Sequence, residues 1–172
     1  MCGILFIKDN NLNLNKAKQA LSVIKHRGPD STNTMAEDNM FLGHNRLSII
    51  DLDEKANQPM AIDNGKIILI FNGEIYNHML LRNKKLAEVS FITNSDSELV
   101  LRGFKKLGLK FFDHLRGMYS FVILDRRVDE KKIISVRDNF GIKPLYVYKK
   151  SGIHIIASEI KSILAYLNKN DD

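Results

Sequence analysis

MYSFVILD (Met118–Asp125) and KIISVR (Lys132–Arg137) are the two segments that indicate the fold class. The first is apolar along most of its length, as expected of a strand that is covered on both faces. The mostly charged linker Arg127–Lys131 is short, so the two strands are expected to pair as an antiparallel hairpin. This part of the sequence therefore predicts an antiparallel sheet that contains buried strands.

Further strands are predicted on both sides of this hairpin. A second hairpin is expected from Pro144–Tyr148 and Gly152–Ala157. Other strands are expected at Gly3–Ile7, around Met40–Ile50 and at Lys66–Asn72. The last of these reads KIILIFN, and such an isoleucine-rich, almost wholly apolar run is typical of a buried strand.

Helices are predicted between and after the strands. The apolar stripe from Leu14 to Ile24 has helical spacing, and this helix is expected to stop near Pro29. The other helices are expected at Tyr76–Leu86, from a cap at Ser95 or Asp96 through Leu107, and from a cap at Ser158 to Leu167. Because strands outnumber helices and occur in adjacent pairs, the expected class is an α+β layered sandwich with helices on its outer faces.

The composition limits the broad class of protein. The chain has 172 residues, of which 44% are hydrophobic, and this suits a single domain, expected over 1–167 with a polar tail at 168–172. Only a five-residue apolar run precedes Lys8, which is too short for a signal peptide, and no run could span a membrane. One cysteine permits no intramolecular disulfide. A free thiol without an export signal predicts a cytoplasmic protein with no membrane partner.

The net charge of +6 suggests a nucleic-acid partner at first sight. However, the lysines occur as scattered pairs at the ends of predicted elements, and no nucleic-acid-binding motif accompanies them. A solvated basic surface without a nucleic-acid partner is therefore expected, and a surface for an acidic partner stays as an alternative. The five histidines have no metal-ligand spacing, so each is expected at the surface or in a loop, and no metal site is predicted.

Cys2 is the residue with the clearest chemical potential. A lone cysteine is commonly a small buried hydrophobe, but removal of Met1 would place a free α-amine beside this thiol. The amine has a pKa of roughly 7.7–8.0 and the thiol one of roughly 8.5. A terminal amine can therefore activate the sulfur as a nucleophile without a histidine base.

Nine motifs in a fixed order support this reading of Cys2. They are MCGI (Met1–Ile4), HRGPDS (His26–Ser31), GHNRLSIIDL (Gly43–Leu52), NQPM (Asn57–Met60), FNGEIYNH (Phe71–His78), TNSDSELVL (Thr93–Leu101), GMYSFVILD (Gly117–Asp125), VRDNFGIKPLYV (Val136–Val147) and ASEIKSIL (Ala157–Leu164). The set resembles the class II glutamine amidotransferase domain, and is most similar to the glutaminase half of glutamine-hydrolysing asparagine synthetases. That resemblance spans essentially the whole chain and implies the N-terminal-nucleophile hydrolase fold, a four-layer αββα sandwich.

The resemblance also implies catalytic roles for three residues. Cys2 would attack the side-chain amide of L-glutamine, release ammonia and form a thioester that water hydrolyses to glutamate. The side-chain amide of Asn72 and the backbone N–H of Gly73 would form the oxyanion hole. The alternative reading of the last two residues, taken alone, is an ordinary Asn-Gly turn after a strand.

Substrate binding is implied for a second set of residues. Arg46 would hold the α-carboxylate of glutamine, and its planar fork suits that group. Asp96, with Glu74 nearby, would hold the α-ammonium. A surface arginine and a helix-capping aspartate are the ordinary alternatives. Backbone groups of four successive residues are also expected to line the pocket, namely Leu47, Ser48, Ile49 and Ile50.

Two arginine–aspartate pairs in the motifs are expected to be structural. Arg27 and Asp30 are interpreted as residues that order a loop beside the nucleophile. Arg137 and Asp138 are interpreted as an internal framework without a chemical role.

The resemblance implies partners as well. Asparagine synthetases continue into an ATP-using domain with an SGGxDS-type phosphate loop, and no such motif is present here. No cofactor is therefore expected in this domain, and ATP and Mg²⁺ are expected only in the absent synthetase domain or in a separate subunit. A homodimer stays as an alternative assembly. The alternative function is a regulatory module that binds glutamine without efficient turnover.

Overall fold

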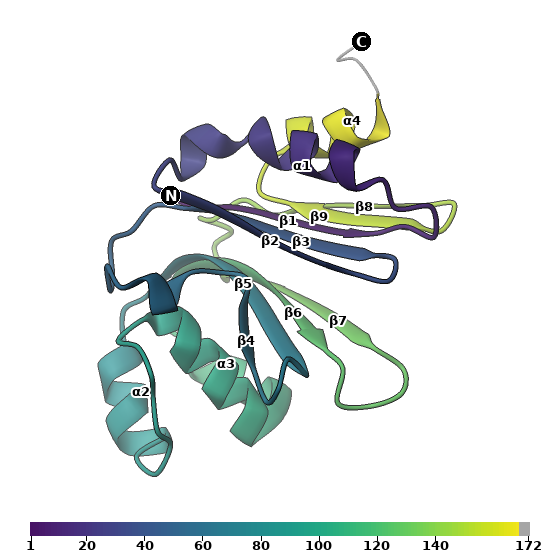
Figure 1. Cartoon of the computed structure of the whole chain (residues 1–172). Coiled ribbons are helices and arrows are strands. Elements are labelled where there is room, and N and C mark those ends of the chain that lie inside the picture. The colour runs from purple at the N-terminus through teal and green to yellow at the C-terminus, as the bar shows by residue number, and fades with distance from the viewer. Residues whose placement is uncertain (169–172) are drawn as a thin grey trace.

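The computed structural model describes residues 1–168 as a sandwich of four layers (Figure 1). Two antiparallel sheets face each other at the centre, and helices cover the outer face of each sheet. The expected α+β class and the αββα layer order are therefore confirmed. Of the polar tail expected at 168–172, all but Asn168 lies outside the described residues.

The first sheet has five strands in the order β2-β3-β1-β9-β8. The bounds are Gly3–Lys8 (β1), Ser31–Glu37 (β2), Met40–Arg46 (β3), Tyr146–Lys150 (β8) and Ile153–Ala157 (β9). The central strand, β1, pairs with β3 so that Gly3 lies opposite Asn45. This register brings Cys2, just before β1, to the end of β3 where Arg46 and the following loop begin.

The second sheet has four strands in the order β4-β5-β6-β7. The bounds are Met60–Ile62 (β4), Ile67–Ile75 (β5), Gly117–Asp125 (β6) and Lys132–Arg137 (β7). Asp125 pairs with Lys132 in the antiparallel ladder of β6 and β7, which confirms the first hairpin. The second predicted hairpin is confirmed by β8 and β9, in which Lys150 lies opposite Ile153.

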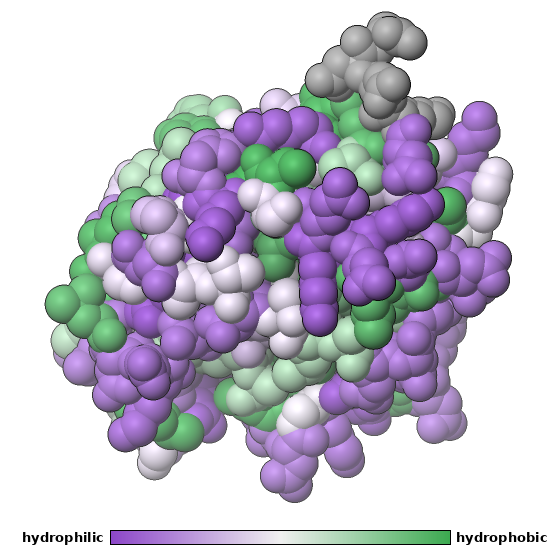
Figure 2. Space-filling view, turned by 45° about the horizontal axis from the view of Figure 1, so that its top comes forward, coloured by the Kyte–Doolittle hydropathy of each residue, from purple (hydrophilic) through white to green (hydrophobic). Residues whose placement is uncertain are grey.

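Helices pack on the two outer faces of the sandwich. Helices α1 (Leu14–Ser22) and α4 (Ile160–Leu167) cover the first sheet, and α2 (His78–Lys85) and α3 (Asp96–Leu107) lie on the side of the second. Short 3₁₀ turns occur at Lys25–Arg27, Glu54–Ala56 and Gly108–His114. With the layer of α1 and α4 turned forward, the surface is mostly hydrophilic, with apolar side chains scattered between the polar ones (Figure 2).

Alternation along β1 shows how the sequence builds two of the apolar layers. Ile4 and Phe6 point between the two sheets, whereas Leu5 and Ile7 point toward α1 and α4. All four side chains are fully buried. Since burial of one such side chain contributes about 1.5–3 kcal/mol, β1 is anchored from both faces, and the position of Cys2 is fixed with it.

Three sequence predictions need correction, and one strand was missed. β2 was not predicted, because STNTMAE is polar and forms an edge strand with alternating exposure. Ser158 does not cap α4; its hydroxyl accepts a hydrogen bond from the N–H of Ile4 at 3.0 Å, and Glu159 occupies the cap position without a side-chain bond. The strand expected to reach Ile50 ends at Arg46, and the strand expected to end at Asn72 continues to Ile75.

Candidate active site

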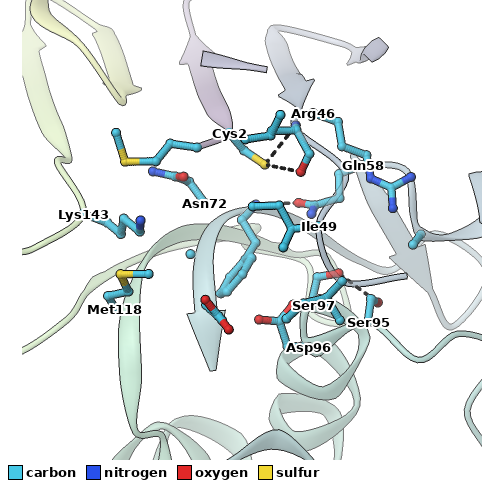
Figure 3. A pocket seen from close by; sticks show the side chains of 17 residues that line it. Cys2, Arg46, Ile49, Gln58, Asn72, Ser95, Asp96, Ser97, Met118 and Lys143 are labelled. Atoms are coloured by element: carbon cyan, nitrogen blue, oxygen red, sulfur yellow. Dashed lines mark hydrogen bonds between the residues drawn. The ribbon is translucent and has the colours of Figure 1, made fainter. Parts of the chain in front are cut away.

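A pocket of about 210 Å³ opens where the ends of β1, β3 and β5 meet the start of α3 (Figure 3). It brings together residues from segments that are far apart in the sequence. Of the ten residues expected in the site, nine line this pocket: Cys2, Arg46, Leu47, Ile49, Ile50, Asn72, Gly73, Glu74 and Asp96. Ser48 does not line it, because its backbone N–H turns away to donate to Asp30 Oδ2 at 2.7 Å.

The thiol of Cys2 lies against the first residue of the loop after β3. Its Sγ is 3.5 Å from the backbone nitrogen of Leu47 and 3.7 Å from the carbonyl oxygen of the same residue. Arg27 holds the backbone from the other side, since its Nε donates to the Cys2 carbonyl at 2.9 Å. Burial raises the pKa of the Cys2 thiol, and the N–H of Leu47 and the charge of Arg46 offset part of that shift.

The loop-ordering role expected of Arg27 and Asp30 agrees with these contacts. Arg27 also forms an ion pair with Glu159 at 2.9 Å. The cation thus links the start of β1 to the start of α4, and Asp30 fixes the loop at Ser48. Both residues act on the backbone beside Cys2 without lining its pocket.

Asn72 is a buried amide without a partner. Its side chain is 1% exposed, and neither Nδ2 nor Oδ1 has a hydrogen-bond partner within residues 1–168. A buried polar group left in this way costs about 1–3 kcal/mol. The Asn72 amide can therefore donate to and accept from a ligand at the wall of the pocket that Cys2 lines (Figure 3).

Gly73 is part of a strand, so the reading of Asn72-Gly73 as a turn is wrong. It lies opposite Tyr119 in the ladder of β5 and β6. A Cβ at this position would lie 2.4 Å from the carbonyl oxygen of Met118 and 2.6 Å from Cα of Tyr119. Such distances are shorter than van der Waals contact, so only glycine lets β5 and β6 approach this closely beside the pocket.

Arg46 is a buried cation with no carboxylate partner among the described residues. It is 5% exposed, and its guanidinium donates to the carbonyl of Asp53 at 3.1 Å, to Asn57 Oδ1 at 2.8 Å and to the carbonyl of Asp51. These neutral acceptors hold the loop after β3 without neutralising the charge. Arg46 is therefore no surface residue, and its charge is available to an anion in the pocket.

Asp96 faces the pocket because another residue caps α3. The hydroxyl of Ser95 accepts from the N–H of Glu98 at 3.2 Å, which settles the cap in favour of Ser95. Asp96 Oδ2 accepts from the N–H of Ile75 at 2.9 Å. Burial raises the pKa of the Asp96 carboxyl above its usual range, although that hydrogen bond acts in the opposite direction. The half-buried Glu74 adds a second acidic side chain to the same pocket.

Sequence reasoning missed several residues of the pocket wall. Phe71, Gln58 and Met118 belong to quoted motifs but had no assigned place in the site. The largest omission is Lys143, a lysine that is only 6% exposed and lines the same pocket. The signal was available in FGIKPL, where a lone lysine stands between apolar residues after Arg137 and Asp138 rather than in a surface pair.

The expected location of the histidines is wrong for His44. This residue lies on β3, is fully buried, and its Nε2 is 3.0 Å from the carbonyl oxygen of Phe71. Burial lowers its pKa to about 4, so the ring is neutral near pH 7. Within residues 1–168, no group of three or more His, Cys, Asp or Glu side chains is arranged to hold a metal ion.

The geometry can be compared with known proteins. A family model described as "Glutamine amidotransferase domain" matches residues 1–172, the whole chain. The chain belongs to the glutamine amidotransferase domain family. The resemblance inferred from the nine motifs is thereby confirmed.

Relatives of this glutamine amidotransferase domain are much longer than the chain. It is 41% identical over 149 residues to "Amidase chry2" of Gibberella zeae, and this match covers 86% of the chain and 22% of that protein. It is 39% identical over 164 residues to glutamine-hydrolyzing asparagine synthetase B of Escherichia coli, with coverage of 94% and 29%. The chain thus spans less than a third of the length of either relative.

Solved structures share the fold of the domain at low sequence identity. A glutamine phosphoribosylpyrophosphate amidotransferase from B. subtilis superposes with a TM-score of 0.81 at 20% identity. That match covers 96% of this chain and 43% of the other. In the described part of the amidotransferase domain, helices are either too short or too polar to cross a bilayer.

Proposed function

We propose that the chain hydrolyses L-glutamine to glutamate and ammonia, with Cys2 as nucleophile after removal of Met1. The observation that carries this proposal is the unpartnered amide of Asn72 in the pocket of Cys2. The pocket offers a cation at Arg46 and an anion at Asp96, which match the two charged groups of a free amino acid. Family membership supports the same reaction.

Glutamine would be held by its α-amino acid end. The uncompensated guanidinium of Arg46 would bind the α-carboxylate, and the buried carboxylate of Asp96, with Glu74, would bind the α-ammonium. This leaves the side-chain amide to extend toward Cys2. The Asn72 amide and the Gly73 N–H would then receive the oxygen of that amide as it gains negative charge.

The reaction would proceed in two balanced steps. The amine of Cys2 accepts the thiol proton, the sulfur bonds to the amide carbon, and the C–N bond breaks as the ammonium returns that proton to the leaving nitrogen. In the second step the amine accepts a proton from water, whose oxygen displaces the sulfur from the thioester. The proton then returns to the thiolate, and glutamate leaves.

Arg46→Lys is expected to raise the KM for glutamine roughly 10-fold or more with a smaller change in kcat, because it removes the bidentate contact with a group that does not react. The loop after β3 should also loosen, since the carbonyls of Asp51 and Asp53 lose their donors. Steady-state kinetics on the processed chain measure the first effect. A fall in kcat at unchanged KM would contradict the assignment of Arg46 to the carboxylate.

Glutamine affinity is expected to fall as the pH is lowered through the raised pKa of Asp96. Only the ionised carboxylate can bind the substrate ammonium, so binding is complete above this pKa and weakens about tenfold per pH unit below it. Calorimetric titration of the inactive Cys2→Ala chain isolates binding from catalysis. Asp96→Asn should bind weakly at every pH, and an unchanged pH profile in that variant would refute the role.

The ammonia would be used by a synthetase domain or subunit. The similarity to longer asparagine synthetases supports this partner, and aspartate is the acceptor we propose. Apolar side chains are exposed on loops beside the pocket, among them Ile49, Leu52, Ile142 and Phe140, the last of which is 89% exposed. These loops are where we place the partner, with a homodimer as the alternative. A free thiol further supports a cytoplasmic location.

The proposal is tested with the purified chain and glutamine alone. Glutamate and ammonia should form without ATP, Mg²⁺ or aspartate, and mass spectrometry should show that active molecules lack Met1. Glutamine binding by calorimetry without release of glutamate would favour a regulatory module instead. Normal turnover by chains that demonstrably retain Met1 would refute the role of the terminal amine.

A further inference from the structure

The loop between β7 and β8 is built around one carboxylate. Asp138 accepts backbone hydrogen bonds from Phe140 at 3.1 Å and Ile142 at 2.9 Å through Oδ1, and from Lys143 at 3.0 Å and Tyr119 at 3.2 Å through Oδ2. Burial opposes ionisation, but these N–H groups together lower the pKa of Asp138. The loop is therefore fixed around a permanent anion.

A guanidinium fixes the same loop from its carbonyl side. Arg137 donates through Nε to the carbonyl of Lys143 at 2.8 Å and through Nη2 to that of Gly141 at 2.6 Å. Gly141 has a φ of +64°, a conformation that favours glycine, and a Cβ there would lie 3.0 Å from the guanidinium. The hydroxyl of Ser120 binds the carbonyl of Pro144 at 3.2 Å. Lys143 is thus held on both sides by rigid contacts.

This framework places the ammonium of Lys143 at the pocket. The side chain is 6% exposed and lines the same cavity as Cys2, Asn72 and Met118. Figure 3 shows it extending toward the cavity from the side opposite Arg46. Lys143 Nζ forms neither an ion pair nor a hydrogen bond with any residue in 1–168. Lysine side chains are ordinarily exposed, and a buried lysine is ordinarily paired with an anion. The burial of Lys143 without such a partner therefore indicates that its charge has a function in the pocket.

Met1, at the chain terminus, lines the same pocket as Lys143. Burial lowers the pKa of the α-amine on Met1, and the charges of Lys143 and Arg27 lower it further, while Cys2 and Asp30 raise it. Removal of Met1 moves the amine one residue along, onto Cys2, which lines the pocket together with Lys143.

The other charges near the terminus are less free to act. Arg27 is paired with Glu159 at 2.9 Å. Across the pocket, Arg46 and Asp96 oppose each other in their effect on the thiol of Cys2. Lys143 lines the pocket together with Met1 and Cys2, and it forms no ion pair with a carboxylate among residues 1–168.

Given the proposed glutaminase reaction, we propose that Lys143 is a positioning residue that keeps the amine of Cys2 neutral and so able to accept a proton. Arg137 and Asp138 hold Lys143 in place for this purpose. The proton taken by the amine leaves Cys2 Sγ, and the resulting ammonium returns it to the departing nitrogen of glutamine. Repulsion from Lys143 destabilises the protonated amine. This keeps the resting amine free of a proton and favours transfer of the proton to the leaving nitrogen.

The test is the pH profile of kcat/KM for glutamine, which reports the essential base of the free enzyme. The neutral variants Lys143→Met and Lys143→Gln should move the acidic limb to higher pH by roughly one unit. Activity should then fall about tenfold on that limb and stay close to wild type on the alkaline plateau. Lys143→Arg should restore the wild-type limb. Two neutral variants are used so that misfolding of one, seen in its thermal unfolding, does not decide the result.

The matched control is Lys149→Met, which removes a lysine charge from the exposed surface of β8. Its acidic limb should not move. An unmoved limb in a folded neutral Lys143 variant would overturn the inference while leaving the glutaminase function intact. A uniform loss of rate at all pH values, not restored by arginine, would also overturn it, since that pattern indicates a purely structural role. Absence of turnover in the processed wild-type chain would instead refute the proposed function itself.

Discussion

Cys2→Ala is expected to lower glutamine hydrolysis on the order of 10⁶-fold, the range seen when a covalent nucleophile is removed. No other thiol exists in the chain to replace it. The terminal amine, Asn72 and Arg46 would all remain, yet no thioester could form without the sulfur. Release of glutamate and ammonia from the processed chain, followed over hours at high enzyme concentration, measures the residual rate.

The fold should survive this change. Within residues 1–168, the hydrogen bonds of the sulfur are the two long ones with Leu47, at 3.5 and 3.7 Å, and β1 is anchored by its own buried side chains. The thermal midpoint should therefore shift little, and calorimetry should still detect glutamine binding. Cys2→Ser should also be nearly inactive, because a hydroxyl ionises far less readily than a thiol. Substantial turnover by Cys2→Ala would end the proposal.

Asn72→Ala is expected to lower kcat roughly 10²–10³-fold, as does removal of one oxyanion-hole donor in other hydrolases. The KM should change much less, because the amide acts on charge that develops during the reaction. Stability should be maintained, since the side chain gives up no hydrogen bond within the described residues. A change confined to KM would contradict the oxyanion assignment.

Asn45→Ala provides the matched control for this variant. Asn45 is a fully buried asparagine on β3 whose amide donates to the carbonyl of Leu21 at 2.9 Å and accepts from the Thr32 hydroxyl at 2.8 Å. Its removal should cost about 1–3 kcal/mol of unfolding free energy and leave kcat close to wild type. Asn72→Ala should thus lower the rate, whereas Asn45→Ala should lower the stability.

The sequence predicted most of the fold because its strands carry strong local signals. Buried strands such as β5 and β6 are apolar runs, and the helix α3 has both a cap at Ser95 and an exit at Gly108. The edge strand β2 escaped prediction because it is held by its ladder with β3 rather than by apolar side chains. Likewise the contact of Ser158 with β1 is a long-range event that local capping rules could not anticipate.

The motifs predicted which residues form the candidate site, but they did not predict the burial and hydrogen bonding of those residues. The family resemblance identified Asn72 and Arg46, but only the packed structure reveals that, among the described residues, one is an amide without partners and the other a cation without a carboxylate. Lys143 was missed because the lone lysine in FGIKPL is only a weak local sign of burial. Its placement depends on the contacts of Arg137 and Asp138, which were expected to have a structural role only.

The central position of β1 has a consequence for synthesis on the ribosome. The first strand to emerge needs β9, Ile153–Ala157, as one of its two neighbours, and contacts of such high sequence separation form late. While the polypeptide grows, Cys2 can be exposed to methionine removal on a terminus that is not yet enclosed. A nascent chain that stops before β9 would carry the nucleophile but lack the strand beside it. Competence to release ammonia should therefore arise only when the last strand has docked.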